Sequence, residues 1–238
     1  MKHLAHQDGP LAVSLTAAHM AAAVTLQSRM PLWVETNRAF QRLHANVPGF
    51  DLPASLLKVA AVNQLYSTNV FAVARMAEHV TKIMVTPPDD PLRCVEAIAA
   101  LPPVPGQQHD RKHWSFASKF VNFFVDNRCP IYDSYAVSMV AYHLGRGRYA
   151  WDDTAPFATF VSHLQRLQQM TGISCSVGEL DTYLWIAGQY RAWCRNAERA
   201  QINTEARRLF REDSAEVKTL LHALLPSVPP TPGVALPS

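Results

Sequence analysis

The chain contains little glycine and little charge for its length, and both shortages narrow the fold. Of its 238 residues only 9 are glycine, whereas 17 are proline. A sheet-rich protein needs more glycine for its turns, so this balance favours helices joined by proline-containing loops. Charged residues make up 17% and apolar residues 48% of the chain. This composition excludes a disordered chain and permits a large buried core.

Metal-ligand spacing is absent as well. The four cysteines lie far apart and form no CxxC pair, so they match neither zinc nor iron–sulfur ligand spacing. The ten histidines include no HExxH or similar pair, and we expect neither a metal nor another cofactor. Buried free thiols in a reducing cytoplasm are the expected state of Cys94, Cys129, Cys175 and Cys194.

Long apolar runs are missing too. The longest run falls far short of the roughly 20 residues that span a bilayer, and the polar residues 1–10 show no targeting pattern. We therefore expect a soluble, monomeric protein of the cytoplasm with no membrane partner. The formal net charge of +3 permits a partner that carries phosphates, but a charge this small does not require one.

Apolar residues recur at helical spacing along most of the chain, and no segment alternates as a strand does. The predicted class is therefore all-α. A polar segment at 63–69 is expected to divide the longest run into two helices. We expect one domain over residues 1–225 and a disordered, proline-rich tail at 226–238. The predicted helices lie at residues 11–27, 32–44, 54–84, 90–100, 111–125, 134–144, 156–170 and 178–209.

The strongest chemical signal is a lysine surrounded by phenylalanines. Lys119 falls among the aromatic residues of 116–124, and apolar surroundings lower the pKa of a lysine and leave more of the nucleophilic amine. Asp133 follows fourteen residues later, after a proline break that lets the chain reverse. An amine and a carboxylate suit attack on a carbon that develops positive charge, such as an anomeric carbon. An exposed amphipathic lysine and an ordinary capping aspartate fit the same spacing.

Four stretches of the chain share motifs with one enzyme family: KHWSFASK (112–119), PIYDSY (130–135), NQLYST (63–68) and ELDTYLW (179–185). Together they resemble the helix–hairpin–helix (HhH-GPD) DNA glycosylase superfamily, with the 8-oxoguanine DNA glycosylase/AP lyases nearest. The first stretch corresponds to the family's L-P-G-h-G-x-K hairpin, the second to a V-D-x-H-like stretch and the third to an S-x-Q-T-like segment. The fourth resembles a late helix of archaeal 8-oxoguanine glycosylases.

The resemblance implies a fold and two catalytic residues. The family has two helical lobes with an active-site cleft between them, so we expect such a fold here, with a six-helix lobe over about 54–145. The family's hairpin lysine falls on Lys119 and its essential aspartate on Asp133. Ser115 and Ala117 replace the hairpin glycines that present amides to a phosphate. The cluster-ligating cysteines of endonuclease III are absent, so no iron–sulfur cluster is expected.

The same resemblance suggests residues that contact the bases. Gln64 and Tyr66 are candidates to fill the gap left by an extruded base or to stack on its partner, and both also fit a polar helix break. Trp185 is a candidate to stack on the flipped base, with core packing as the equal alternative. Asp181 either binds a base edge or caps the helix that begins there.

Basic residues gather beside the candidate catalytic pair. Residues 111–148 contain six basic and two acidic side chains, and basic side chains near a lesion can bind the flanking phosphates. A solvated rim is the alternative. Farther along the chain, Arg191, Arg195 and Arg199 recur at helical spacing and are expected to form a solvated stripe. The candidates for phosphate contacts are Arg111, Lys112, Arg128, Arg146 and Arg148.

The sequence therefore predicts a DNA glycosylase with AP lyase activity, which flips a damaged or modified base out of double-stranded DNA and excises it. Lys119 would attack C1′, and Asp133 would stabilise the oxocarbenium-like charge. In a monofunctional enzyme Asp133 would activate water instead. The abasic product could serve base excision repair or defence against phage DNA with hypermodified bases. A non-catalytic helical DNA-binding module and a helical protein-interaction domain stay open as alternatives.

Overall fold

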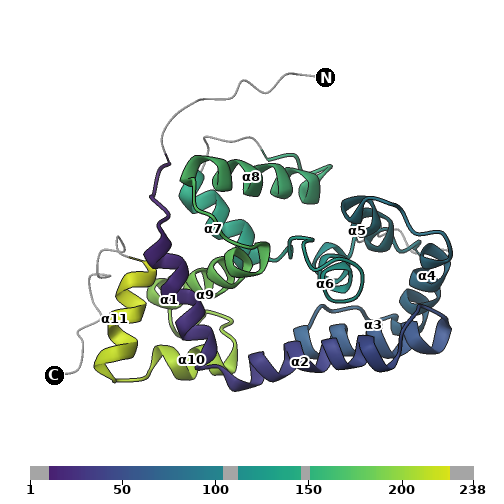
Figure 1. Ribbon diagram of the computed structural model, residues 1–238, viewed down its shortest axis with the longest axis horizontal. Coiled ribbons are helices and arrows are strands. Elements are labelled where there is room, and N and C mark those ends of the chain that lie inside the picture. Colours follow the sequence, from purple (N-terminus) through teal and green to yellow (C-terminus); the bar gives the residue numbers. More distant parts are fainter. Residues whose placement is uncertain (1–10, 104–111, 146–150, 226–238) are drawn as a thin grey trace. The chain divides into compact units, whose positions relative to one another are not determined.

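The structure is a computed structural model that describes residues 11–103, 112–145 and 151–225. These residues form α-helices joined by loops and contain no strand, which confirms the predicted all-α class for the described part of the chain (Figure 1). The helices are α1 (Ala17–Ser28), α2 (Pro31–Asn46), α3 (Leu52–Tyr66), α4 (Val73–Val85), α5 (Pro91–Ala99), α6 (Trp114–Phe124), α7 (Ser134–Leu144), α8 (Pro156–Thr171), α9 (Val177–Arg195), α10 (Thr204–Phe210) and α11 (Ala215–Leu224).

The polar segment after α3 divides two helices, as predicted. Ser67 ends α3 in the left-handed conformation, with φ of 48°. The side-chain oxygen of Asn63 then accepts hydrogen bonds from the hydroxyl of Thr68 at 3.0 Å and from the N–H of Val70 at 2.8 Å. The amide nitrogen of Asn63 donates to the carbonyl of Val70 at 3.1 Å. One asparagine thus fixes the backbone of this loop, which α4 follows.

The helical run predicted over 178–209 is interrupted. α9 ends at Arg195 and α10 begins at Thr204, because Asn203 starts a new helix. Its side-chain oxygen accepts hydrogen bonds from the N–H groups of Glu205 and Ala206 at 2.9 and 3.3 Å, the usual action of an N-cap asparagine. Helix α11 lies beyond the predicted helices.

The predicted start of the first helix at residue 11 is wrong as well, since α1 begins at Ala17. The backbone N–H groups of Ala12 and Val13 both donate to the carbonyl of His143, at 2.8 and 3.3 Å. These residues are therefore anchored to α7 and do not take part in α1. The predicted disordered tail at 226–238 lies outside the described residues.

The chain divides into two compact units. Unit 1 comprises residues 1–34, 134–153 and 162–238, and unit 2 comprises residues 35–133 and 154–161. Each unit is described by itself below. The predicted cleft between two lobes and the predicted six-helix lobe stay predictions.

Unit 2 contains an aromatic core in which α6 is central. The rings of Phe40 on α2 and Phe123 on α6 stack with centroids 4.4 Å apart, and Phe116 and Phe120 are fully buried. α6 packs against both α3 and α5. The N–H of His113, directly before α6, donates to the carbonyl of Ala99 at the end of α5, at 3.0 Å. This core fixes the position of α6, the helix that carries Lys119.

Unit 1 is built around α9, which packs against α1 and α7. α7 and α9 approach closely at Gly188, where a Cβ atom would lie 2.8 Å from the Cβ of Tyr135. Beside this contact, Arg191 is only 9% exposed, with its guanidinium 4.3 Å from the ring centroid of Tyr142. The predicted solvated stripe is therefore wrong for Arg191, because the α7–α9 contact buries that face of α9.

Candidate functional site

Lys119 is buried in unit 2 and holds a defined position. Its side chain is 5% exposed, and the amine donates to the hydroxyl of Ser115 at 2.8 Å. Ser115 precedes Lys119 by four residues, so the two side chains lie on the same face of α6. The amine also lies 5.7 Å from the ring centroid of Tyr66. The alternative of an exposed amphipathic lysine is therefore wrong.

Tyr66, the last residue of α3, is part of the wall around this amine. Its hydroxyl donates to the side-chain oxygen of Asn37 at 3.1 Å. Its ring lies 5.8 Å from the ring of Phe40 and 5.4 Å from that of Phe123. Tyr66 is thus packed beside Lys119, and its predicted place in a base gap stays a prediction. We call Lys119, Ser115, Tyr66 and Asn37 the lysine cluster.

Asp133 is connected to the lysine cluster through the backbone. The hydroxyl of Ser118 is buried and accepts a hydrogen bond from the backbone N–H of Tyr132 at 2.9 Å. Ser118 immediately precedes Lys119, and Tyr132 immediately precedes Asp133. The chain therefore reverses between the two candidate residues, as the proline break predicts. Asp133 is half-buried and directly precedes α7.

The loop between α6 and Asp133 is held from α6. The side-chain nitrogen of Asn122 donates to the carbonyls of Cys129 at 2.7 Å and Asn127 at 3.2 Å. Within this loop Arg128 donates to both carboxylate oxygens of Asp126, at 3.0 and 2.8 Å. Hydrogen bonding to Arg128 lowers the pKa of Asp126, and the same bonds raise the pKa of Arg128. The charge of Arg128 is thus largely offset by Asp126.

The other predicted phosphate contacts are only partly described. Lys112 is exposed and lies just before α6. The remaining three, Arg111, Arg146 and Arg148, lie outside the described residues.

The loop after α3 presents a different aromatic residue to solvent. Gln64 is exposed on α3, as a residue that contacts DNA must be. Phe71 is 87% exposed and is the most exposed large apolar side chain among the described residues. It follows the backbone that Asn63 fixes. Phe71 is not among the predicted site residues, because a lone phenylalanine in a sequence gives no sign that it is exposed.

Asp181 and Trp185 lie on α9 in unit 1, whereas the lysine cluster lies in unit 2. The alternative role of Asp181 as a helix cap is wrong, because Ser176 caps α9 and accepts from the N–H of Glu179 at 3.2 Å. Trp185 is half-buried, and its ring lies edge-on to the ring of Trp33 with centroids 3.5 Å apart. Trp185 therefore packs against Trp33, and its contact with a flipped base stays a prediction.

A second buried lysine was missed by the sequence analysis. Lys58 on α3 is fully buried, and its amine donates to the carbonyl of Gly49 at 2.6 Å and lies 4.2 Å from the ring centroid of Phe50. Burial lowers its pKa, and the charge of Asp51 partly opposes this. Helical spacing from the buried Ala54 and Val62 gives the signal, since position 58 shares their face.

The thiols and the possible metal ligands do not form a site in the described part of the chain. All four cysteines are free; Cys94 and Cys129 are buried, and the other two are half-buried. Burial raises the pKa of Cys94 to about 11 and that of Cys129 to about 12. Among described residues no three His, Cys, Asp or Glu side chains are grouped to hold a metal ion. In the same residues no helix is both long and apolar enough to cross a membrane.

Comparison with known proteins finds similarity over about half of the chain. The family model HI_0787_N, described as an N-terminal domain, matches residues 19–128, a range that includes Lys119 and ends before Asp133. A Haemophilus influenzae protein with the printed name "Uncharacterized protein" is 28% identical over 132 residues, which are 53% of this chain. The chain spans 62% of the length of that relative. No solved structure matches. These similarities name no activity.

Proposed function

We propose that this chain is a DNA glycosylase in which Lys119 is the nucleophile and Asp133 stabilises developing positive charge. The observation that carries the proposal is the lysine cluster together with the hydrogen bond from Tyr132 to Ser118. A buried amine beside aromatic rings is an uncommon arrangement. Here the residue before it, Ser118, accepts a hydrogen bond from the residue before the carboxylate, Tyr132. The resemblance to HhH-GPD glycosylases supports assigning DNA as the substrate.

The proposed chemistry uses both groups in one substitution. The neutral amine of Lys119 attacks C1′ of the flipped nucleotide, and the N-glycosidic bond breaks as the base leaves with its electron pair. The amine loses a proton, and the base takes one up. Opening of the sugar ring then gives a Schiff base, which permits β-elimination and strand nicking. The carboxylate of Asp133 stabilises the oxocarbenium-like charge at C1′. Ser115 holds the amine in place before attack.

Base contacts belong to the same proposal. Phe71 and Gln64 fill the gap left by the extruded base in this proposal, since both are exposed. Tyr66 is instead packed against the phenylalanine core. An exposed aromatic ring on a fixed loop can stack on a base without reordering the loop. Trp185 and Asp181 stay candidates for contacts to the flipped base.

One observation favours a second candidate, a non-catalytic helical DNA-binding module. Ser115 and Ala117 lie inside α6, so these positions form no tight turn that presents amides to a phosphate. The family's hairpin glycines would form such a turn. A chain that retained the helices and had lost the chemistry would bind DNA and release no base.

An oligonucleotide panel separates the two candidates. Each duplex carries one modified base, and base release is measured as strand breakage after alkali, beside binding to the same duplex. We expect release from at least one duplex, with no release from the unmodified control. Binding without release from any member would support the non-catalytic module. We also expect base release to continue when no metal is added and EDTA is present.

A further inference from the structure

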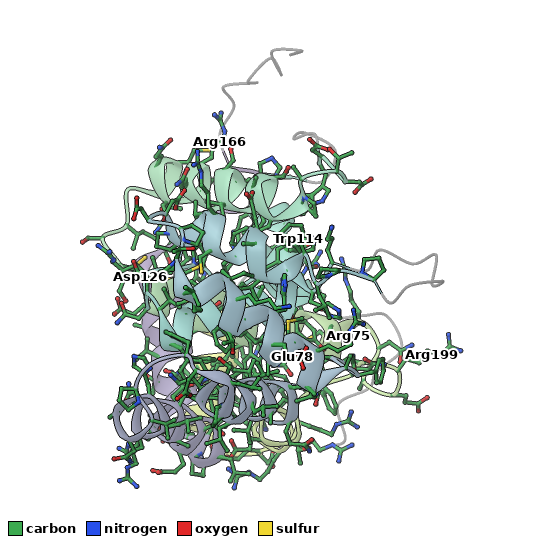
Figure 2. All side chains as sticks on the ribbon, turned by 90° about the vertical axis from the view of Figure 1, so that its right-hand side faces the viewer. Arg75, Glu78, Trp114, Asp126, Arg166 and Arg199 are labelled. Atoms are coloured by element: carbon green, nitrogen blue, oxygen red, sulfur yellow. The ribbon has the colours of Figure 1, made fainter. Side chains whose placement is uncertain are left out.

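The segment 195–211 of unit 1, which runs from the last residue of α9 to the residue after α10, is rich in arginine. Four of its five arginines are exposed and Arg207 is half-buried. Figure 2 shows the side chain of Arg199 pointing away from the ribbon. We call this the arginine surface; its members are Arg195, Arg199, Arg207, Arg208 and Arg211.

The backbone under the arginine surface is fixed. The N–H of Asn203 donates to the side-chain oxygen of the buried Gln189 at 2.7 Å. Arg207 donates to the carbonyl of Ala200 at 3.1 Å, which ties α10 to the loop before it. The ring of Phe210 lies 5.1 Å from that of Tyr190 on α9. The arginines therefore extend from a segment that these contacts hold to the rest of unit 1.

The acidic residues nearby in the sequence are engaged elsewhere. Glu205 accepts hydrogen bonds from the N–H groups of Leu32 and Trp33, both at 2.9 Å, at the start of α2. Glu212 and Glu216 both form ion pairs with Arg29. Asp213 pairs with Lys218.

The arginine surface consequently keeps its positive charge. No carboxylate of the described residues forms an ion pair with any of its five members, and Glu198 is the one exposed acid within the segment 195–211. Arg207 and Arg208 each donate to a backbone carbonyl, which leaves their charge uncompensated. The guanidinium of Arg211 lies 5.4 Å from the ring centroid of Trp193. Such a ring supports a guanidinium without neutralising it.

We propose that the arginine surface binds the phosphate backbone of DNA, as a contact made by unit 1 in addition to the catalytic residues of unit 2. The choice of DNA rests on the proposed function. Guanidinium groups bind phosphates through paired hydrogen bonds, and a duplex offers one charge per about 1.7 Å of its axis, so several separated arginines can each find one. A membrane surface fits less well, because the apolar Leu209 and Phe210 of α10 are buried and leave no apolar face to enter lipid.

The test measures how the affinity for a fluorescein-labelled, unmodified duplex changes with salt. Fluorescence anisotropy is recorded from about 50 to about 200 mM NaCl, a range over which phosphate contacts lower the affinity strongly as salt rises. The variant is R195Q/R199Q/R211Q, and the matched control is R38Q/R42Q/R93Q, which removes the same charge from exposed positions of unit 2. We expect the log–log slope of the first variant to become shallower by about 2 to 3. The control should keep the native slope, and thermal melting should confirm that both variants fold.

The outcomes separate this inference from the proposed function. Native slopes in the first variant, or an equal change in the control, would overturn the inference. Absence of duplex binding by the native chain would overturn it too, as would binding to phosphatidylserine vesicles or to polyglutamate in place of duplex. A changed slope without base release keeps the arginine surface and contradicts the glycosylase. Base release with an unchanged slope supports the glycosylase and overturns the arginine surface.

Discussion

The hydroxyl of Ser118 accepts a hydrogen bond from the backbone N–H of Tyr132, at 2.9 Å. This bond joins the residue before Lys119 to the residue before Asp133 across fourteen positions of the chain. This buried hydroxyl, together with the bonds from Asn122 to the same loop, holds the backbone of the two candidate residues together.

Replacing Ser118 by alanine removes that acceptor and leaves the Tyr132 N–H without this partner. We expect S118A to lower the free energy of unfolding by about 1 to 2 kcal/mol, the usual effect of losing one buried hydrogen bond. Base excision should fall more than stability does, because Asp133 loses its tether. Urea unfolding and excision rates measure the two effects. The exposed Ser28, which bonds only within α1, supplies the control S28A, and an equal loss of excision there would contradict the tether.

Asp133 should contribute its charge to the reaction and little to stability. D133N keeps the shape of the side chain, and asparagine is an equally good residue directly before a helix, so the unfolding free energy should change by less than about 1 kcal/mol. Excision should fall by about 100-fold or more, since the side chain no longer has a carboxylate to stabilise the developing charge. The matched control is D126N, which removes a carboxylate from the same loop. A folded D133N protein that excises at the native rate would show that Asp133 is only a cap.

Gly188 should be required for the approach of α7 to α9. A methyl group at this position would meet the Cβ of Tyr135 at 2.8 Å and its backbone oxygen at 3.0 Å, so the two helices would have to separate. We expect G188A to destabilise the protein by about 1 to 3 kcal/mol. In the control G178A, on the same helix, an added Cβ meets nothing within 4 Å. Thermal melting of the two variants measures the difference, and equal melting temperatures would contradict the close packing.

His143 should make stability fall in mild acid. Its ring accepts from the hydroxyl of Tyr183 at 2.7 Å and donates to the carbonyl of Val13 at 2.9 Å. Burial lowers its pKa from the ordinary 6.5 to about 4. Between these values the unfolded chain binds a proton that the folded chain does not, so the unfolding free energy decreases as the pH falls from 6.5 and levels off near 4. At about 1.4 kcal/mol per unit, the loss reaches roughly 3 kcal/mol.

The pH dependence is assigned to His143 by difference. Burial also lowers the pKa of other histidines, among them the buried His19 and the half-buried His79. Urea unfolding of the native chain and of H143Q is measured from about pH 7 to about pH 4, the range in which the protonation of His143 differs between the folded and the unfolded chain. The difference between the two proteins gives the loss of unfolding free energy that is due to His143. H143Q should be less stable at pH 7 and should lose stability less steeply in acid. The exposed His222 supplies the control H222Q, which should follow the native curve.

Helical spacing predicts most of the fold, whereas the candidate site depends on contacts that spacing does not contain. The bounds of α7 follow from a proline-fixed turn and a glycine at its end, both local signals. The break between α9 and α10 also has a local cause, the cap at Asn203, which is a residue type that commonly begins a helix. The bond between Ser118 and Tyr132 has no such signal, because it joins residues that become neighbours only when the chain reverses. The burial of Lys119 was expected from its aromatic neighbours, but its partner Ser115 was not.

The most direct test of the central claim is borohydride trapping of the protein on DNA. A Schiff base between the amine of Lys119 and C1′ is reduced to a stable secondary amine, which joins the protein covalently to an oligonucleotide that carries an abasic site. The native chain and the control K82Q, which changes an exposed lysine of unit 2, should be trapped equally. K119Q should bind the oligonucleotide and give no covalent product, and peptide mapping of the native product should find the adduct on Lys119. Trapping of K119Q at the native level, or an adduct on Lys58, would contradict the assignment of Lys119 as the nucleophile.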